Sequence, residues 1–225
     1  MTSDPRELAA AAVAYAKPRL RGWLHAVTAP VALVSGVVLI ALAPTEPAAA
    51  AAATFSLTAV VLFTTSAIYH RGNWSQRAER RLKRLDHANI FFLIAGTYTP
   101  FAVLALHGET RVAVLASVWG TALAGAIFRV LWVEAPRWTY VPLYIGLGWA
   151  AGFVAPQFVH GVGTTAAVLI GAGGACYTVG GVIYGMKRPN PSPRWFGFHE
   201  LFHALTVAGF VCQYVAASMV VYHAA

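Results

Sequence analysis

Apolar and polar residues alternate along the chain in long blocks. Seven apolar segments, each near the roughly 20 residues that a helix needs to cross a ~30 Å hydrocarbon core, are separated by short polar stretches. The pattern predicts an all-α integral membrane protein, a bundle of seven transmembrane helices. The predicted helices are Trp23–Ala43, Ala48–His70, Leu85–Leu106, Val112–Val133, Trp138–Val159, Val162–Met186 and Phe196–Tyr222.

The composition supports a membrane domain over 23–225 and sets one segment apart. Of the 225 residues, 58% are hydrophobic and 11% are charged, whereas about a quarter of the residues in soluble domains are charged. Residues 1–22 have a helix start at Asp4 and Pro5, a break at Pro18 and four basic residues. Because this segment is too short and too charged to span a bilayer, we predict that it contains a helix lying along the membrane surface.

The basic residues fall on alternate loops. Lys and Arg together number 16, and the formal charge is +8. With seven helices, 15 of them lie on the side of the N-terminus and Arg111 alone lies on the other. Because cytoplasmic loops carry the excess of Lys and Arg, we predict a multi-pass protein of the cell membrane with its N-terminus in the cytoplasm and its C-terminus outside. The predicted partners of these loops are anionic membrane lipids, not nucleic acid.

Ionisable residues inside membrane helices are costly, so each of them is a functional candidate. His70 ends the second predicted helix, Asp86 begins the third, and His199 and His203 begin the seventh. The predicted topology places all these helix ends at the cytoplasmic face. The spacing of His199 and His203 puts their rings about 40° and 6 Å apart on one helix, within reach of one ion. Three histidines and an open fourth position make up a catalytic zinc site.

Two further residues complete the predicted site. Asp86 would hold or deprotonate a zinc-bound water, whose pKa the metal lowers toward ~7. Ser66 lies four residues before His70 on the same helix face and would hydrogen-bond to the water or to a substrate oxyanion. His87 points about 100° away from Asp86, and we expect it either to support the ligands from behind or to be solvated. The other histidines stand at predicted helix ends and are expected to be interfacial: His25, His107, His160 and His223.

The letters HELFH at 199–203 also fit His-Glu-x-x-His, the zinc signature of many metalloproteases. Histidines four residues apart occur by chance as well, and a lone histidine at a membrane boundary is commonly just an interfacial polar residue. The convergence of His70, Asp86 and the pair from the last helix at one depth favours a shared metal site. A structural zinc that clamps the second, third and seventh helices together would use the same residues, so both roles stay open.

Several sequence blocks resemble a known family. SAIYH (66–70), LDHANIFFLIAGTYTPF (85–101) and FGFHELFHAL (196–205) resemble the signature blocks of the haemolysin III family. That family is the bacterial branch of the progestin and adipoQ receptor superfamily. KPRLRGWLHA (17–26) and GGVIYGMKRP (180–189) are similar to its flanking blocks. The resemblance covers nearly the whole chain, in order.

The resemblance implies seven helices and a zinc ion near the cytoplasmic leaflet. The implied ligands are His70, His199 and His203, with Asp86 holding the zinc-bound water. The receptor branch has Gln where this chain has Glu200, so we do not expect Glu200 to be needed for metal binding, and the protease mechanism is disfavoured. The receptor branch is credited with ceramidase-like activity, and related membrane hydrolases share the Ser, Asp and three-His set. Bacterial members have been linked to haemolysis, membrane fluidity and energetic homeostasis.

These observations leave several functional hypotheses. The first is a zinc-dependent hydrolase of a lipid amide or ester bond at the cytoplasmic leaflet, in which Asp86 accepts a proton from water and Ser66 orients an oxygen. The second is a non-enzymatic sensor of membrane state with a structural zinc, in which Gly96 and Pro100 kink the third helix. A haemolytic pore is disfavoured because no continuous polar stripe runs through the predicted helices. An intramembrane protease is disfavoured because no later helix supplies an Asp.

Overall fold

The computed structural model describes residues 18–150, 152 and 155–224, and these residues form a helical bundle. The described part of the chain contains eight α-helices, and its one β-type contact is an isolated bridge between Ser192 and Phe196. The helices are α2 (Trp23–Ala41), α3 (Glu46–Arg71), α4 (Gln76–Ala105), α5 (Gly108–Leu131), α6 (Arg137–Gly148), α7 (Ala155–Val162), α8 (Thr164–Met186) and α9 (Phe198–Tyr222). The surface helix predicted within 1–22 lies outside the described residues, apart from a turn at 18–22.

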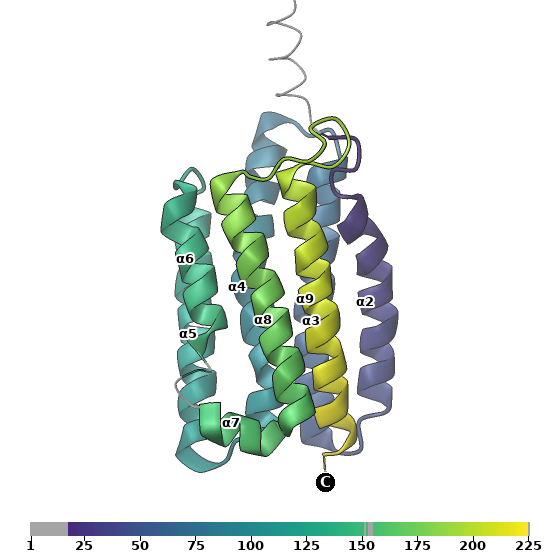
Figure 1. Ribbon diagram of the computed structural model, residues 1–225, viewed down its shortest axis with the longest axis vertical. Helices are drawn as coiled ribbons and strands as arrows, with labels where there is room; N and C mark the ends of the chain where they lie inside the picture. The colour runs from purple at the N-terminus through teal and green to yellow at the C-terminus, as the bar shows by residue number, and fades with distance from the viewer. Residues whose placement is uncertain (1–17, 151, 153–154, 225) are drawn as a thin grey trace, which may run out of the picture.

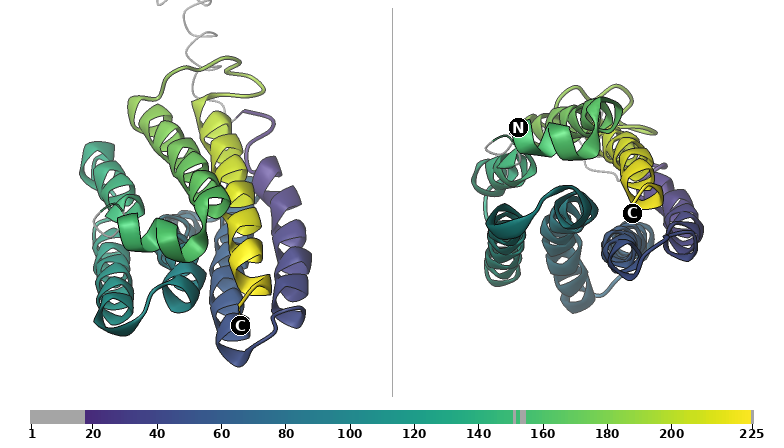
Figure 2. Two further views of the ribbon diagram at one scale, coloured as in Figure 1. Left: turned by 60° about the horizontal axis from the view of Figure 1, so that its bottom comes forward. Right: turned by 90° about the horizontal axis from the view of Figure 1, so that it is seen from below.

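The long helices run side by side in one bundle (Figure 1), and neighbours along the chain pack against each other. The closest pairs are α2 with α3, α3 with α4, α4 with α5, and α8 with α9. Seen end-on, the helices form a ring in which α9 lies between α2 and α8 (Figure 2). This arrangement brings the start of the last helix next to the first helix and to the end of α3.

Six of the described helices are long and apolar enough to cross a membrane: α2, α3, α4, α5, α8 and α9. Large apolar side chains are exposed on their outer faces, for example Val31 and Val34 on α2 and Val168 on α8. In water such a surface would be unfavourable, but in a bilayer it contacts lipid. The chain is therefore a multi-pass membrane protein.

The segment predicted as one helix at Trp138–Val159 is interrupted. α6 ends at Gly148 after 12 residues, and α7 has 8 residues and begins at Ala155. Figure 1 shows α6 running beside α5, whereas α7 lies across one end of the bundle. Neither piece alone has the length of a spanning helix, so the prediction of a single continuous helix here is wrong.

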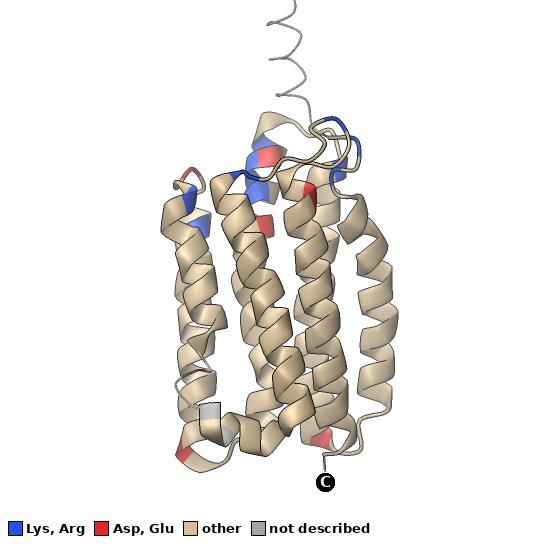
Figure 3. Cartoon of the chain, in the orientation of Figure 1, with Lys and Arg blue, Asp and Glu red and all other residues tan. Residues whose placement is uncertain are grey.

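Charged residues gather at one end of the bundle, where α4, α6 and α9 begin (Figure 3). The C-terminus lies at the opposite end. α4 begins at Gln76, nine residues before the predicted start, because the Ser75 hydroxyl accepts the backbone N–H of Ala78 and caps the helix. The charged turns 76–84 therefore extend α4 beyond its apolar part.

Candidate metal site

The three histidines predicted as ligands lie together at the charged end of the bundle. His70 is in the last turn of α3, and His199 and His203 are in the first two turns of α9. One ring nitrogen from each lies within 4.8 Å of the other two, and each of the three residues is at most 9% exposed. The start of α2 is fitted closely against this cluster, because a Cβ on Gly22 (φ +79°) would come within 2.7 Å of the His70 Cβ.

One pair of these nitrogens has the spacing that two zinc ligands would have. The Nε2 atoms of His70 and His199 are 3.2 Å apart. Two nitrogens bound at about 2.0–2.1 Å to a tetrahedral zinc would be roughly 3.3 Å apart, so the observed separation is already close to that of a ligand pair. The His203 ring centroid lies 4.6 Å from that of His199 and 5.0 Å from that of His70. The donor set, three imidazoles without a thiolate, also suits zinc.

Asp86 and Ser66 lie next to the cluster, as predicted. The Asp86 Oδ2 atom is 3.7 Å from the His70 Nε2 atom. This distance is too long for a direct hydrogen bond but places the carboxylate directly beside the His70 ring. Ser66 borders the same small cavity as Asp86 and interacts with its carboxylate, and both residues are buried. The structure thus brings all five predicted site residues to one place.

The Glu200 carboxylate makes its contacts outside the histidine cluster, although Glu200 lies between two candidate ligands in the sequence. Its carboxylate is 1% exposed and accepts the backbone N–H of Gly197 at 2.8 Å, which closes the N-terminus of α9. The same carboxylate forms an ion pair with the Arg21 guanidinium, just before α2. In a His-Glu-x-x-His protease the glutamate would act as general base at the metal. Here the Glu200 carboxylate instead connects the start of α9 to the start of α2.

His25 is a member of the site that the sequence reasoning missed. The sequence predicts an interfacial residue, but its side chain is only 3% exposed. Its ring stacks on His203, with the centroids 3.8 Å apart and the planes 6° from parallel, and its edge contacts Phe63. The stacked ring limits how His203 can turn. Its position in the first turn of the first described helix, at the same end of the bundle as the candidate ligands, is the sequence feature that indicates this role. The other three histidines expected at the interface are exposed, as predicted: His107, His160 and His223.

His87 is buried, so the alternative of a solvated His87 is wrong. Its Nδ1 atom is paired with the Arg129 guanidinium. From its position in the sequence, Arg129 is expected to be one of the charged loop residues, but its side chain is 0% exposed. Its guanidinium donates hydrogen bonds to the carbonyls of Trp132 (2.9 Å) and Val133 (3.1 Å) and lies over the Tyr140 ring. A guanidinium can only donate hydrogen bonds, so the Nδ1 atom of His87 must accept this one. In a neutral His87 the ring proton is therefore on Nε2.

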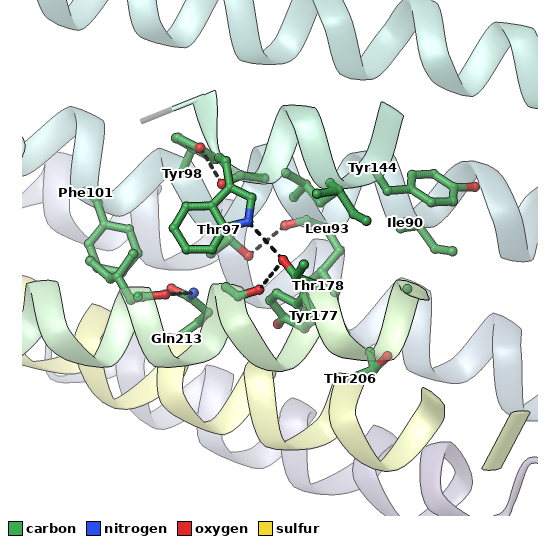
Figure 4. Close-up of a pocket in the computed structure, with 18 of the residues that line it drawn as sticks. Ile90, Leu93, Thr97, Tyr98, Phe101, Tyr144, Tyr177, Thr178, Thr206 and Gln213 are labelled. Carbon is green, nitrogen blue, oxygen red and sulfur yellow. Dashed lines mark hydrogen bonds between the residues drawn. The ribbon is translucent and has the colours of Figure 1, made fainter. Parts of the chain in front are cut away.

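Two adjoining cavities lie beside these residues. A small cavity of about 40 Å³ is lined by Ser66, Asp86, His87 and the histidines of α2 and α9. A larger, mostly apolar cavity of about 340 Å³ follows, with walls from α4, α6, α8 and α9 (Figure 4). Six residues line both cavities: Leu62, Ile90, Tyr144, Gly181, Phe202 and Thr206. The candidate metal site therefore lies at one end of a pocket large enough for a small ligand.

Comparisons with known proteins agree with the sequence blocks. The sequence model of the family described as "Haemolysin-III related" matches residues 13–214. The chain is 30% identical over 164 residues to "Hemolysin-3" of Bacillus cereus, covering 71% of this chain and 74% of that protein. It is 28% identical over 145 residues to "Hemolysin-3 homolog" of Bacillus subtilis (strain 168), covering 64% of this chain and 68% of that protein.

Proposed function

The chain belongs to the haemolysin-III related family, and we propose that it is a zinc-dependent hydrolase of an amide or ester bond in a membrane lipid. The observation that carries the proposal is the placement of three buried imidazole nitrogens, with Asp86 beside them, at the end of an apolar cavity. A zinc that served only as a clamp between α3 and α9 would need neither the carboxylate nor the cavity.

We further propose that the chain crosses the membrane seven times, with α6 and the residues after it forming the fifth crossing. The charged end of the bundle would then face the cytoplasm, because Lys and Arg are retained on that side. This orientation puts the histidine cluster at the depth of the cytoplasmic leaflet. A lipid of that leaflet would bring its head group to the cluster and extend its chain into the larger cavity.

When bound, zinc would polarise the carbonyl and lower the pKa of water, so that hydroxide forms near neutral pH. Asp86 would accept the proton from water as the oxygen attacks the carbonyl carbon. It would then return this proton to the leaving nitrogen or oxygen as the C–N or C–O bond breaks. The Ser66 hydroxyl holds the Asp86 carboxylate in position. His87, whose Nδ1 is held by Arg129, has Nε2–H as its donor, and that donor would stabilise a polar group in the small cavity.

Metal content and lipid composition test the proposal together. Purified wild-type protein should hold about one zinc per chain, and the double variant His199→Ala, His203→Ala should hold none. The control is His223→Ala, which removes an exposed histidine just past the end of the same helix and should keep the metal. Asp86→Asn should also keep the metal, because all three imidazoles stay, but should lower lipid hydrolysis by at least about 10²-fold through loss of the base.

The outcomes separate enzyme from clamp. Cells that contain wild-type protein should lose a lipid and gain its fragments relative to cells that contain Asp86→Asn. If the lipids of these two strains match, while the histidine variants lose both zinc and thermal stability, the zinc is structural and the hydrolase proposal is wrong. A purified wild-type protein without stoichiometric zinc would overturn the metal site itself.

A further inference from the structure

The first turns of α4 carry four arginines on one face of the helix, and we call this face the arginine stripe. Its members are Arg77, Arg80, Arg81 and Arg84; the first three are exposed and the last is half-buried. At 100° per residue, these positions fall within an arc of about 100°. Asp86 lies on the opposite side of the helix, so the stripe faces away from the histidine cluster. Figure 3 shows basic residues gathered on these turns.

No guanidinium of the stripe forms an ion pair with an acidic side chain in the part of the chain that the structure describes. Other basic side chains at this end do have such partners. Arg21 pairs with Glu200, and Lys83 pairs with Glu134 at 3.2 Å. Glu79, the acidic residue of these turns, lies on the opposite side of the helix together with Lys83. Several positive charges without counter-charges attract an anionic partner from outside the chain.

Two exposed tryptophans mark the membrane boundary near the end of α3. The indole nitrogen of Trp74 donates to the Ile68 carbonyl at 3.0 Å, so the side chain lies beside the last turns of that helix. The Arg71 guanidinium lies 3.6 Å from the centre of the Trp23 ring, which places the second indole at the same level. Tryptophans gather where the hydrocarbon core meets the head groups, so this boundary is near the depth of the last turn of α3.

The helical rise then gives the depth of the arginines. Asp86 is level with the last turn of α3, because its carboxylate is 3.7 Å from the His70 ring nitrogen. Outward from there, at 1.5 Å per residue, Arg84 lies about 3 Å, Arg81 about 8 Å and Arg77 about 14 Å farther along α4. The head-group layer of one leaflet is about 5–8 Å thick, since a bilayer of about 40–45 Å contains about 30 Å of hydrocarbon. Arg84 and Arg81 are therefore level with the head groups, whereas Arg77 lies past them.

We propose that the arginine stripe binds acidic phospholipids of the adjoining leaflet. Arg81 and Arg84 contact the lipid phosphates, and Arg80, one residue farther out than Arg81, contacts them from the outer edge of the layer. Guanidinium groups bind phosphate through paired hydrogen bonds, and clusters of Lys and Arg directly beside a membrane helix are typical of acidic-lipid binding. Leu85 is exposed next to the stripe, so the surface continues into one that contacts acyl chains. This continuity favours a lipid over a soluble anion.

The lipid selectivity of purified full-length protein tests the inference. The protein is reconstituted into vesicles of equal parts phosphatidylglycerol and phosphatidylcholine and extracted into a mild detergent, and the lipids that stay bound are counted by native mass spectrometry. Wild-type protein should retain phosphatidylglycerol in preference to phosphatidylcholine. Because one basic residue near the membrane surface strengthens the binding of anionic lipid about fivefold, Arg81→Gln should reduce this preference about fivefold. The triple variant Arg80→Gln, Arg81→Gln, Arg84→Gln should abolish it.

Arg77→Gln is the matched control. It removes an exposed arginine from the same face, one turn farther from the membrane than Arg81, and should leave the preference nearly unchanged. In phosphatidylcholine alone all the variants should melt at the wild-type temperature, which shows that they are folded. Phosphatidylglycerol should raise the melting temperature of wild-type protein more than that of the triple variant, since a ligand of the folded state stabilises it.

Several results would overturn the inference. Equal retention of the two lipids by wild-type protein would do so, and so would a wild-type preference in the triple variant. If Arg77→Gln weakens the preference as much as Arg81→Gln, the preference reflects the charge of the whole chain and not contact at the depth of the head groups. If wild-type protein shows no lipid preference but binds a fluorescent single-stranded oligonucleotide that the triple variant does not bind, the partner is a nucleic acid. The proposed hydrolase would stand in each case, because the stripe lies outside the histidine cluster.

Discussion

Replacing Glu200 tests whether the His-Glu-x-x-His segment anchors a helix or performs chemistry. Its buried carboxylate accepts a hydrogen bond from the Gly197 backbone and pairs with Arg21. Removing one partner of a buried ion pair costs about 3–5 kcal/mol. Because the Arg21 side chain is 18% exposed and can turn toward water, we expect Glu200→Ala to lower the free energy of unfolding by about 2–4 kcal/mol. Glu200→Gln keeps one acceptor oxygen but loses the charge, so we expect it to lower the free energy of unfolding by about 1–2 kcal/mol.

The assay is a double-mutant cycle on protein purified in detergent. Thermal or denaturant unfolding is compared for wild type, Glu200→Ala, Arg21→Met and the double variant. If the two side chains stabilise the protein through each other, the double variant should be less destabilised than the sum of the single variants, by roughly 1–3 kcal/mol. All four proteins should keep about one zinc per chain, because the imidazole ligands are unchanged.

Two outcomes would refute this reasoning. If Glu200→Gln loses lipid hydrolysis and keeps wild-type stability, Glu200 acts on the reacting groups and the protease-like mechanism is correct. If the effects of Glu200→Ala and Arg21→Met simply add, the ion pair does not hold the starts of α2 and α9 together. In that case another contact must orient the helix that carries His199 and His203.

Three further predictions concern the metal, its stacked neighbour and the orientation of the chain. Removing zinc with a chelator should lower the melting temperature of wild-type protein but not that of the His199→Ala, His203→Ala variant, because the metal would tie α3 to α9. His25→Ala should weaken zinc affinity about 10-fold, and His25→Phe, which can still stack on His203, should restore most of it; equal affinities in wild type and His25→Ala would exclude this role. Cysteine placed at position 77 should be labelled only from the cytoplasmic side and cysteine at position 223 only from outside, and the reverse pattern would overturn the proposed orientation.

The histidine cluster could be predicted because its residues are costly where they stand. His70, Asp86 and the histidine pair of α9 interrupt apolar segments at the same end of the predicted bundle, so few other arrangements of these residues made chemical sense. The helices themselves were predictable for the same reason, since hydrophobic length alone defines a spanning segment. Six of the seven predicted segments correspond to continuous helices, although the charged start of α4 was missed because polar turns carry no such signal.

The roles of His25, Glu200 and Arg129 could not be predicted, because each depends on a partner that is distant in the sequence. Glu200 pairs with a residue 179 positions away, and Arg129 pairs with one 42 positions away. A lone histidine in the first helix and an arginine near the end of another look like interfacial residues until the packing of the helices is known. Hydrophobic patterns identify which segments are helices, but they do not specify which faces meet.

The interruption between α6 and α7 has a physical cause that the hydrophobic pattern also conceals. The segment is apolar throughout, yet α6 ends at Gly148 and Gly152 lies within the interruption, and each glycine weakens a helix by about 1 kcal/mol relative to alanine. Broken backbone at membrane depth must find other hydrogen bonds or line a protected space. Both conditions hold here, since the Tyr98 hydroxyl bonds to the last carbonyls of α6 and the residues around the break line the larger cavity. Trp149 and Gly152, the described residues of the interruption that border the cavity, thus form part of its wall.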